Sequence, residues 1–136
     1  MNATGDIRGL LASSRATIVA DGIRLSASEV LERAETLGAS LLDQGIQPGD
    51  RVALQLPNSL DVVVSLLGAA CVGVCTVAVN TRYSTAEADD LIARSGARRV
   101  SPPSEMSSTG RAPRATDLTD APFVVFTTSG TTSKPK

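Results

Sequence analysis

RVALQLPNSLDVVVSLLGAACVGVCTVAV, residues 51–79, contains the clearest structural pattern of the chain. Apolar and polar side chains alternate over residues 51–56, which is typical of a strand. Residues 74–79 are β-branched and apolar, and they predict a second, buried strand. Between the two, Asn58 or Ser59 can cap a helix. This stretch therefore predicts a strand, a helix and a second strand in succession.

A membrane helix is the alternative for part of the same stretch. Residues 62–79 contain eighteen consecutive uncharged positions, which meets the lower length limit for a membrane span. The second half of this run is β-branched and interrupted by Gly73, a composition that suits a turn and a strand better than a helix. We therefore favour a soluble α/β interpretation over a span.

The preceding residues predict a hairpin and a helix. Residues 17–25 place an Asp-Gly pair between two short apolar runs, which is the turn chemistry of a tight β-hairpin. Ser26 and Glu29 have the spacing of a capping box, and apolar residues then recur at helical spacing. We predict a helix over about residues 27–44.

The following residues continue the alternation of strands and helices. Ser84 and Glu87 repeat the capping-box spacing and open another helix, residues 98–100 begin a further strand, and residues 123–126 form a last one. Strands that alternate with helices are connected by right-handed parallel crossovers. The predicted fold is a layered α/β structure with a mostly parallel sheet and flanking helices.

The length allows one domain with its own core, because the chain has 136 residues and 42% of them are hydrophobic. We divide it into an N-terminal α/β subdomain over residues 1–100, a linker or loop rich in proline and serine over residues 101–122, and a strand with a terminal loop over residues 123–136.

Composition excludes several classes of function. The net charge is -1, from 13 basic and 14 acidic residues, so neither nucleic acid nor an anionic membrane is an expected partner. The chain has no histidine and two cysteines, which argues against a metal site. Cys71 and Cys75 lie in an apolar run, and we expect two small buried side chains in a reducing cytoplasm rather than a redox pair. No signal peptide is evident.

Residues 127–136 are the part of the sequence whose side chains are most suited to binding a ligand. Six hydroxyl side chains, one glycine and two lysines follow directly after a predicted strand. Hydroxyl and backbone N–H donors with two cations can surround a polyphosphate, and open α/β sheets bind ligands at the carboxyl ends of their strands. The alternative is a solvated chain terminus.

The order of these residues resembles a known family. Residues 128–132, Thr-Ser-Gly-Thr-Thr, followed by Pro-Lys at residues 135–136, are similar to the phosphate loop of the adenylate-forming (AMP-binding) superfamily, which includes acyl-CoA synthetases, adenylation domains of peptide synthetases and luciferases. Residues 45–54, 56–59 and 79–82 resemble further passages of that family. The chain thus looks like the N-terminal portion of the large domain of an acyl-CoA synthetase-like ligase.

The resemblance implies ATP with Mg²⁺ as cofactor and coenzyme A as a possible acceptor. A carboxylic acid and ATP would form an acyl-adenylate, and the acyl group would then pass to a thiol. The residues implied to bind the nucleotide are Thr128, Ser129, Gly130, Thr131, Thr132, Ser133, Lys134 and Lys136. Hydroxyls and amides would contact the β- and γ-phosphates, and Lys136 would offset charge on the leaving pyrophosphate. Ser133 replaces a usual glycine, and a positive φ there would cost ~1 kcal/mol.

The resemblance also implies that catalysis needs more than these residues. Relatives place the acid pocket, the magnesium-binding acid and a hinged lid after this loop, so we expect no catalytic residue or metal ligand within the chain and no activity from it alone. Its partners would be a carboxylic acid and ATP in a complete enzyme, with a C-terminal portion or a second copy. The alternative is a non-catalytic homologue that acts as an interaction module or a split-enzyme subunit.

Overall fold

A computed structural model of the protein describes residues 3–100 and 124–126, with side chains from residue 7 onward. The predicted linker, residues 101–122, lies outside the described residues. A four-stranded sheet consists of β3 (Arg51–Leu54), β4 (Cys75–Ala78), β5 (Arg98–Arg99) and β6 (Val124–Val125). The strand order is β5-β3-β4-β6, and each neighbouring pair is parallel. The predicted parallel α/β architecture is confirmed.

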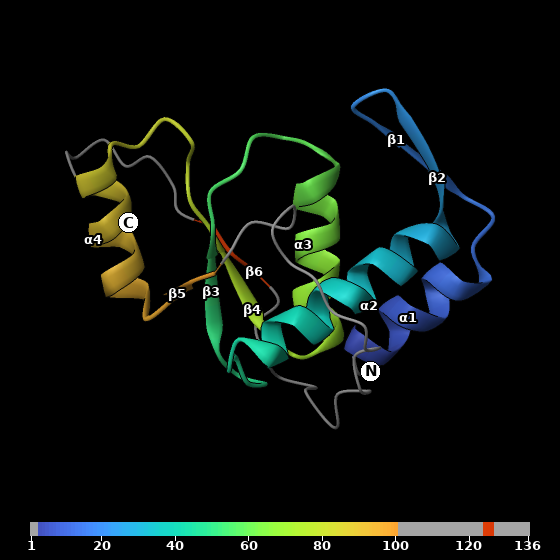
Figure 1. The fold of residues 1–136 in the computed structure, drawn as a ribbon, viewed down its shortest axis with the longest axis horizontal. Coiled ribbons are helices and arrows are strands. Elements are labelled where there is room, and N and C mark those ends of the chain that lie inside the picture. Colours follow the sequence, from blue (N-terminus) through green and yellow to red (C-terminus); the bar gives the residue numbers. More distant parts are fainter. Residues whose placement is uncertain (1–2, 101–123, 127–136) are drawn as a thin grey trace.

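Helices cover both faces of this sheet. Helices α1 (Ala3–Ser13), α2 (Ala27–Asp43) and α3 (Leu60–Cys71) lie on one side, and α4 (Thr85–Ser95) lies on the other (Figure 1). Neighbouring residues of β3 show the division, because Val52 belongs to the cluster formed with α2 and α3, whereas Ala53 packs against α4. Side chains that alternate along each strand therefore contribute to two separate cores.

The predicted hairpin is present and forms a separate two-stranded sheet. Strands β1 (Thr17–Ala20) and β2 (Ile23–Ser26) pair antiparallel. The turn between them has positive φ at both residues, 55° at Asp21 and 73° at Gly22, as a two-residue hairpin turn requires. Figure 1 shows the hairpin extending beyond the helices.

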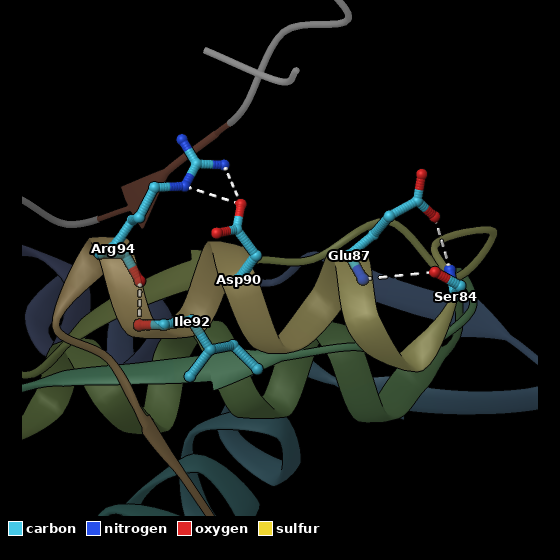
Figure 2. Close-up of polar contacts among 6 residues, drawn as sticks. Ser84, Glu87, Asp90, Ile92 and Arg94 are labelled. Atoms are coloured by element: carbon cyan, nitrogen blue, oxygen red, sulfur yellow. Dashed lines mark hydrogen bonds and ion pairs between the residues drawn. The ribbon is translucent and has the colours of Figure 1, made fainter. Parts of the chain in front are cut away.

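Both predicted capping boxes are confirmed. Before α2, the Ser26 hydroxyl accepts a hydrogen bond from the Glu29 N–H at 3.2 Å, and the Glu29 carboxylate accepts one from the Ser26 N–H at 2.7 Å. Before α4, Ser84 and Glu87 make the same pair of bonds, as Figure 2 shows. Both boxes satisfy N–H groups that the first turn of a helix leaves without intrahelical partners.

The start of α3 departs from the prediction. Ser59 occupies the N-cap position, but its side chain makes no capping hydrogen bond. The Asp21 carboxylate of the hairpin turn instead accepts a hydrogen bond from the Leu60 N–H at 3.0 Å. A residue 39 positions earlier in the sequence therefore caps this helix and fastens the hairpin to it.

Helix α1 was not predicted, whereas the interpretation of residues 62–79 is confirmed. That uncharged run divides into most of α3, a turn at Gly73 with φ of 72°, and β4. Among the residues that the structure describes, no helix combines the length and the hydropathy needed to cross a membrane.

Candidate functional site

Three parallel strands end at one edge of the sheet. The last residue of β3, Leu54, is in register with Ala78 of β4, and Val77 is in register with Val125 of β6. The segments that follow these strands therefore leave the sheet at the same edge. Ligands of open α/β sheets bind outside the carboxyl ends of the strands. We call this end of the sheet, where the carboxyl ends of the strands lie together, the carboxyl sheet edge, and it is the candidate site.

Hydrogen bonds hold the first two segments together. The Val79 N–H donates to the Leu54 carbonyl at 2.8 Å, and the Gln55 side-chain amide donates to the Asn80 carbonyl at 3.0 Å. The Asn80 side-chain oxygen accepts from the Arg82 N–H at 2.9 Å, which closes an Asx-type turn. The ends of β3 and β4 are thus joined by side chains as well as by the sheet.

A cavity of ≈ 440 Å³ opens at this edge, on the face that carries α3. Val62 and Leu66 of α3 line its apolar wall, and Asn58, Asn80 and Thr81 contribute its polar groups. Amide and hydroxyl groups can donate to phosphate or carboxylate oxygens and can accept from a ribose or amine. The cavity therefore combines an apolar wall with polar groups, as small-molecule sites do.

The end of β6 lies at the same cavity. Phe126 follows β6, lines the cavity and is 70% exposed. The predicted nucleotide-binding residues Thr128, Ser129, Gly130, Thr131, Thr132, Ser133, Lys134 and Lys136 lie outside the described residues. The structure thus places the residue that precedes this loop and leaves the loop itself a prediction.

The cysteines lie away from this edge and are not activated. Cys75 begins β4, at the opposite end of the strand from Ala78, and both cysteines are buried free thiols. Burial raises the pKa of the Cys71 thiol, an effect that the Arg8 guanidinium opposes, and burial also raises the pKa of Cys75. A thiol must ionise to act as a nucleophile, so neither side chain is suited to that role. The predicted buried placement is confirmed.

Several residues that line the cavity at this edge are not predicted as binding residues from the sequence. The sequence does not place Asn58, Asn80, Thr81 or Phe126 among the predicted binding residues. Each of them follows the carboxyl end of a strand, and that position could have identified them. Among the described residues, no group of three or more His, Cys, Asp or Glu side chains could hold a metal ion.

Comparison with known sequences identifies a matching family. The model of the family described as AMP-binding enzyme matches residues 11–101. A methyl-dioxo-octahydro-indenyl propanoyl:CoA ligase of Rhodococcus jostii is 40% identical over 79 residues, which cover 57% of this chain and 15% of the relative. Triostin synthetase I of Streptomyces triostinicus is 34% identical over 85 residues, or 62% of this chain and 16% of the relative.

Solved structures share the fold. The N-terminal subdomain of NpsA from Klebsiella oxytoca, in complex with 3-hydroxyanthranilyl-AMSN, aligns with a TM-score of 0.85 and 22% identity over 99% of this chain and 39% of that one. The O-succinylbenzoate coenzyme A synthetase of Bacillus subtilis, in complex with AMP, aligns with a TM-score of 0.81 and 20% identity over 100% of this chain and 41% of that one.

Proposed function

The chain belongs to the AMP-binding enzyme family, whose model matches residues 11–101, and from this we propose that its carboxyl sheet edge forms one wall of the ATP site of an acyl-adenylate-forming ligase. The position of β6 carries the proposal. Because β6 pairs parallel with β4, the chain reaches Phe126 beside Asn80, two residues before the phosphate-loop sequence begins at Thr128. The described polar groups would then face one side of the nucleotide.

The proposed reaction is the activation of a carboxylic acid. A carboxylate oxygen attacks the α-phosphorus of ATP, and the bond to pyrophosphate breaks, which gives an acyl-adenylate. A thiol sulfur then attacks the acyl carbon and AMP leaves. In this chain, the hydroxyls and amides of residues 128–132 would hold the β- and γ-phosphates, and Lys136 would stabilise charge on the leaving pyrophosphate.

The acceptor thiol is proposed to come from another molecule. Cys71 and Cys75 are both buried, and burial raises the pKa of each. They therefore cannot present a thiolate at the sheet edge. Coenzyme A or a carrier-bound thiol fits this requirement, and the names of the Rhodococcus and Bacillus proteins include coenzyme A.

The 136-residue polypeptide is proposed to be catalytically incomplete by itself. It spans about 15% of the length of the first curated relatives that it matches. We propose that the metal ligand and the acid pocket are supplied by residues that this polypeptide does not contain.

An interaction module is the second candidate. Strand β6 stands at one end of the order β5-β3-β4-β6, and within the described residues its outer edge has no neighbouring strand. An open edge of this kind can pair with a second copy of the chain. Size-exclusion chromatography with light scattering tests this directly, because a stable monomer at all concentrations would contradict it.

ATP binding to the 136-residue polypeptide tests the primary proposal. We expect measurable affinity in equilibrium dialysis, and we expect Lys136→Ala to weaken it about tenfold, the usual effect of losing one charge-assisted hydrogen bond. Arg15→Ala removes an equal charge from an exposed residue outside the proposed site; it is the control and should change affinity less than about twofold. Equal effects of the two substitutions, or no binding by the parent chain, would argue against the assignment.

A second measurement tests the incompleteness of the chain. ATP–pyrophosphate exchange with a panel of aliphatic and aromatic carboxylic acids should remain at background level. Exchange that depends on the added acid would show that the polypeptide activates acids without further residues.

A further inference from the structure

Gln55 follows β3 directly and lies at the carboxyl sheet edge, but it does not line the cavity there. Its side chain is half-buried, and its amide nitrogen Nε2 donates to the Asn80 carbonyl at 3.0 Å. Asn80 lies 25 positions later in the sequence, in the segment that follows β4, and it does line the cavity. A side chain outside the cavity is therefore bonded to the main chain of a residue that forms its wall.

Asn80 begins a turn that covers residues 80–83. The Tyr83 N–H donates to the Asn80 carbonyl at 3.1 Å, which is the hydrogen bond that closes a β-turn. The Arg82 N–H donates to the Asn80 side-chain oxygen at 2.9 Å. Both bonds are made within the turn, whereas the bond from Gln55 joins the turn to the end of β3.

The elements on either side of this turn are held by other contacts. The Val79 N–H donates to the Leu54 carbonyl at 2.8 Å before the turn begins. After the turn, α4 starts with the capping box of Ser84 and Glu87. Neither the pairing of β3 with β4 nor the start of α4 requires the Gln55 side chain, so we expect its hydrogen bond to affect the turn alone.

The turn supplies polar groups to the candidate site. Asn80 and Thr81 line the cavity together with Phe126, and the phosphate-loop sequence begins two residues after Phe126. Both turn residues are exposed, so a turn without a connection to β3 would become ordered only when a ligand binds. The loss of freedom on binding lowers affinity, and a turn that is ordered beforehand avoids that loss.

We propose that Gln55 is a positioning residue of the nucleotide site. Its hydrogen bond to Asn80 fixes the turn against β3, and Thr81 then presents its hydroxyl at the cavity before the nucleotide arrives. Gln55 itself contacts no ligand. The inference rests on the proposed function, because the nucleotide is the ligand proposed for the carboxyl sheet edge.

Amide hydrogen exchange measured by NMR tests the positioning without any nucleotide. Gln55→Met keeps the length of the side chain and removes its donor, so exchange of the Arg82 and Tyr83 N–H groups should become at least about threefold faster. Gln47→Met is the matched control, because Gln47 is exposed, precedes β3 and does not line the cavity. It should leave both rates unchanged, and the urea midpoints of both variants should equal that of the parent. Unchanged exchange in Gln55→Met would overturn the inference.

The affinity for ATP, measured by equilibrium dialysis, tests the consequence for binding. Gln55→Met should weaken ATP binding at least about threefold, and Gln47→Met should leave it unchanged. Thr81→Val removes the hydroxyl that the turn presents. In that background Gln55→Met should weaken binding by less than about 1.5-fold, because the group that Gln55 positions is already absent. Fully additive effects of the two substitutions would overturn the inference.

The outcomes for ATP separate this inference from the proposed function. No ATP binding by the parent chain would overturn the proposed function, and with it the nucleotide as the ligand of this turn. Binding by the parent that Gln55→Met leaves unchanged would overturn the inference about Gln55 and would leave the proposed function in place.

Discussion

The thiol of Cys71 lies at the last residue of α3, within the part of the core where the Arg8 guanidinium donates to the Cys71 carbonyl at 3.2 Å. Burial raises the pKa of this thiol because a thiolate would lose its hydration there, and the positive charge of Arg8 offsets only part of that effect. Cys75 experiences the same effect of burial. Both side chains therefore stabilise the fold only in their protonated form.

The pKa of each thiol is higher in the folded chain than in the unfolded chain, and this difference predicts a loss of stability at alkaline pH. Below about pH 8.5, the ordinary pKa of a thiol, folded and unfolded chains both retain the protons and stability is constant. Above it the unfolded chain ionises first, so the free energy of unfolding falls by up to ~1.4 kcal/mol per pH unit for each thiol, until the pH exceeds the raised folded pKa. Urea denaturation between pH 7.5 and 9.5 measures the decline, and Cys71→Ala/Cys75→Ala should abolish it. The same decline in that double variant would contradict the assignment.

At the same scale, contacts between distant residues limit what could be predicted. The capping boxes of Ser26 and Ser84 were predictable because each depends on two residues three positions apart. The cap of α3 was not, because Asp21 reaches Leu60 only after the hairpin has packed against the helix. The spacing of residues along the sequence identifies hydrogen bonds between near neighbours. It does not reveal a helix cap that a distant residue supplies.

Among the elements, α2 and α3 approach each other closely at Gly68. A Cβ atom there would lie 2.6 Å from the Leu37 Cδ2 and 2.7 Å from the Ala34 carbonyl oxygen. The leucine side chain can move, but the helix backbone at Ala34 cannot move without disturbing its own hydrogen bonds. The absence of a side chain at residue 68 therefore sets the distance between the two helices.

Gly68→Ala is accordingly predicted to destabilise the protein by ~1–2 kcal/mol, because the cost of overpacking exceeds the gain in helix propensity. Gly9→Ala is the control, since a Cβ at Gly9 in α1 meets nothing within 4 Å. That variant should be neutral or more stable by up to ~1 kcal/mol. Thermal or urea denaturation compares the two. Equal stability of both variants would mean that α2 and α3 tolerate a wider separation.

Element prediction succeeded where the pattern is periodic. Strands β3 and β4, and helices α2 and α4, follow runs whose apolar spacing matches their structure. Helix α1 was missed because its stability depends on tertiary contacts, including the reach of Arg8 to Cys71 in α3. The sequence predicts a ligand-binding loop at the carboxyl end of the last strand, but it does not predict the Gln55–Asn80 hydrogen bond that joins the segments after β3 and β4. Such a contact requires the sheet register, which sequence alone does not supply.

In the molecule as a whole, Arg8 joins three helices. Its guanidinium, on α1, contacts the Cys71 carbonyl at the end of α3 and lies 3.8 Å from the Glu35 carboxylate of α2. Glu35 is only 6% exposed, and a buried carboxylate that loses its positive partner destabilises the fold. The Arg8 side chain thus links α1 to both α2 and α3.

Replacement of Arg8 by methionine is predicted to cost about 3 kcal/mol of stability, since it removes a positive partner from a buried carboxylate. Arg8→Met/Glu35→Gln should recover part of that loss, because the second change removes the buried charge. Arg15→Met is the control at an exposed arginine and should change stability by less than about 0.5 kcal/mol. Urea denaturation of the parent protein, of Arg8→Met, of Glu35→Gln and of the double variant yields the coupling energy of the pair. A double variant less stable than Arg8→Met alone would contradict this role for the pair.

The position of β6 also has a consequence for the order in which the protein folds. Strands β3, β4 and β5 come from one segment, residues 51–99, whereas β6 comes from residues 124–125 and takes the edge beside β4. A chain synthesised from its N-terminus exposes the first three strands and their helices well before β6 emerges. We expect β4 to be the outer strand of the sheet at first, and we expect β6 to pair with it after the other three strands have formed. The proposed nucleotide site would therefore be completed last, after the core that supports it.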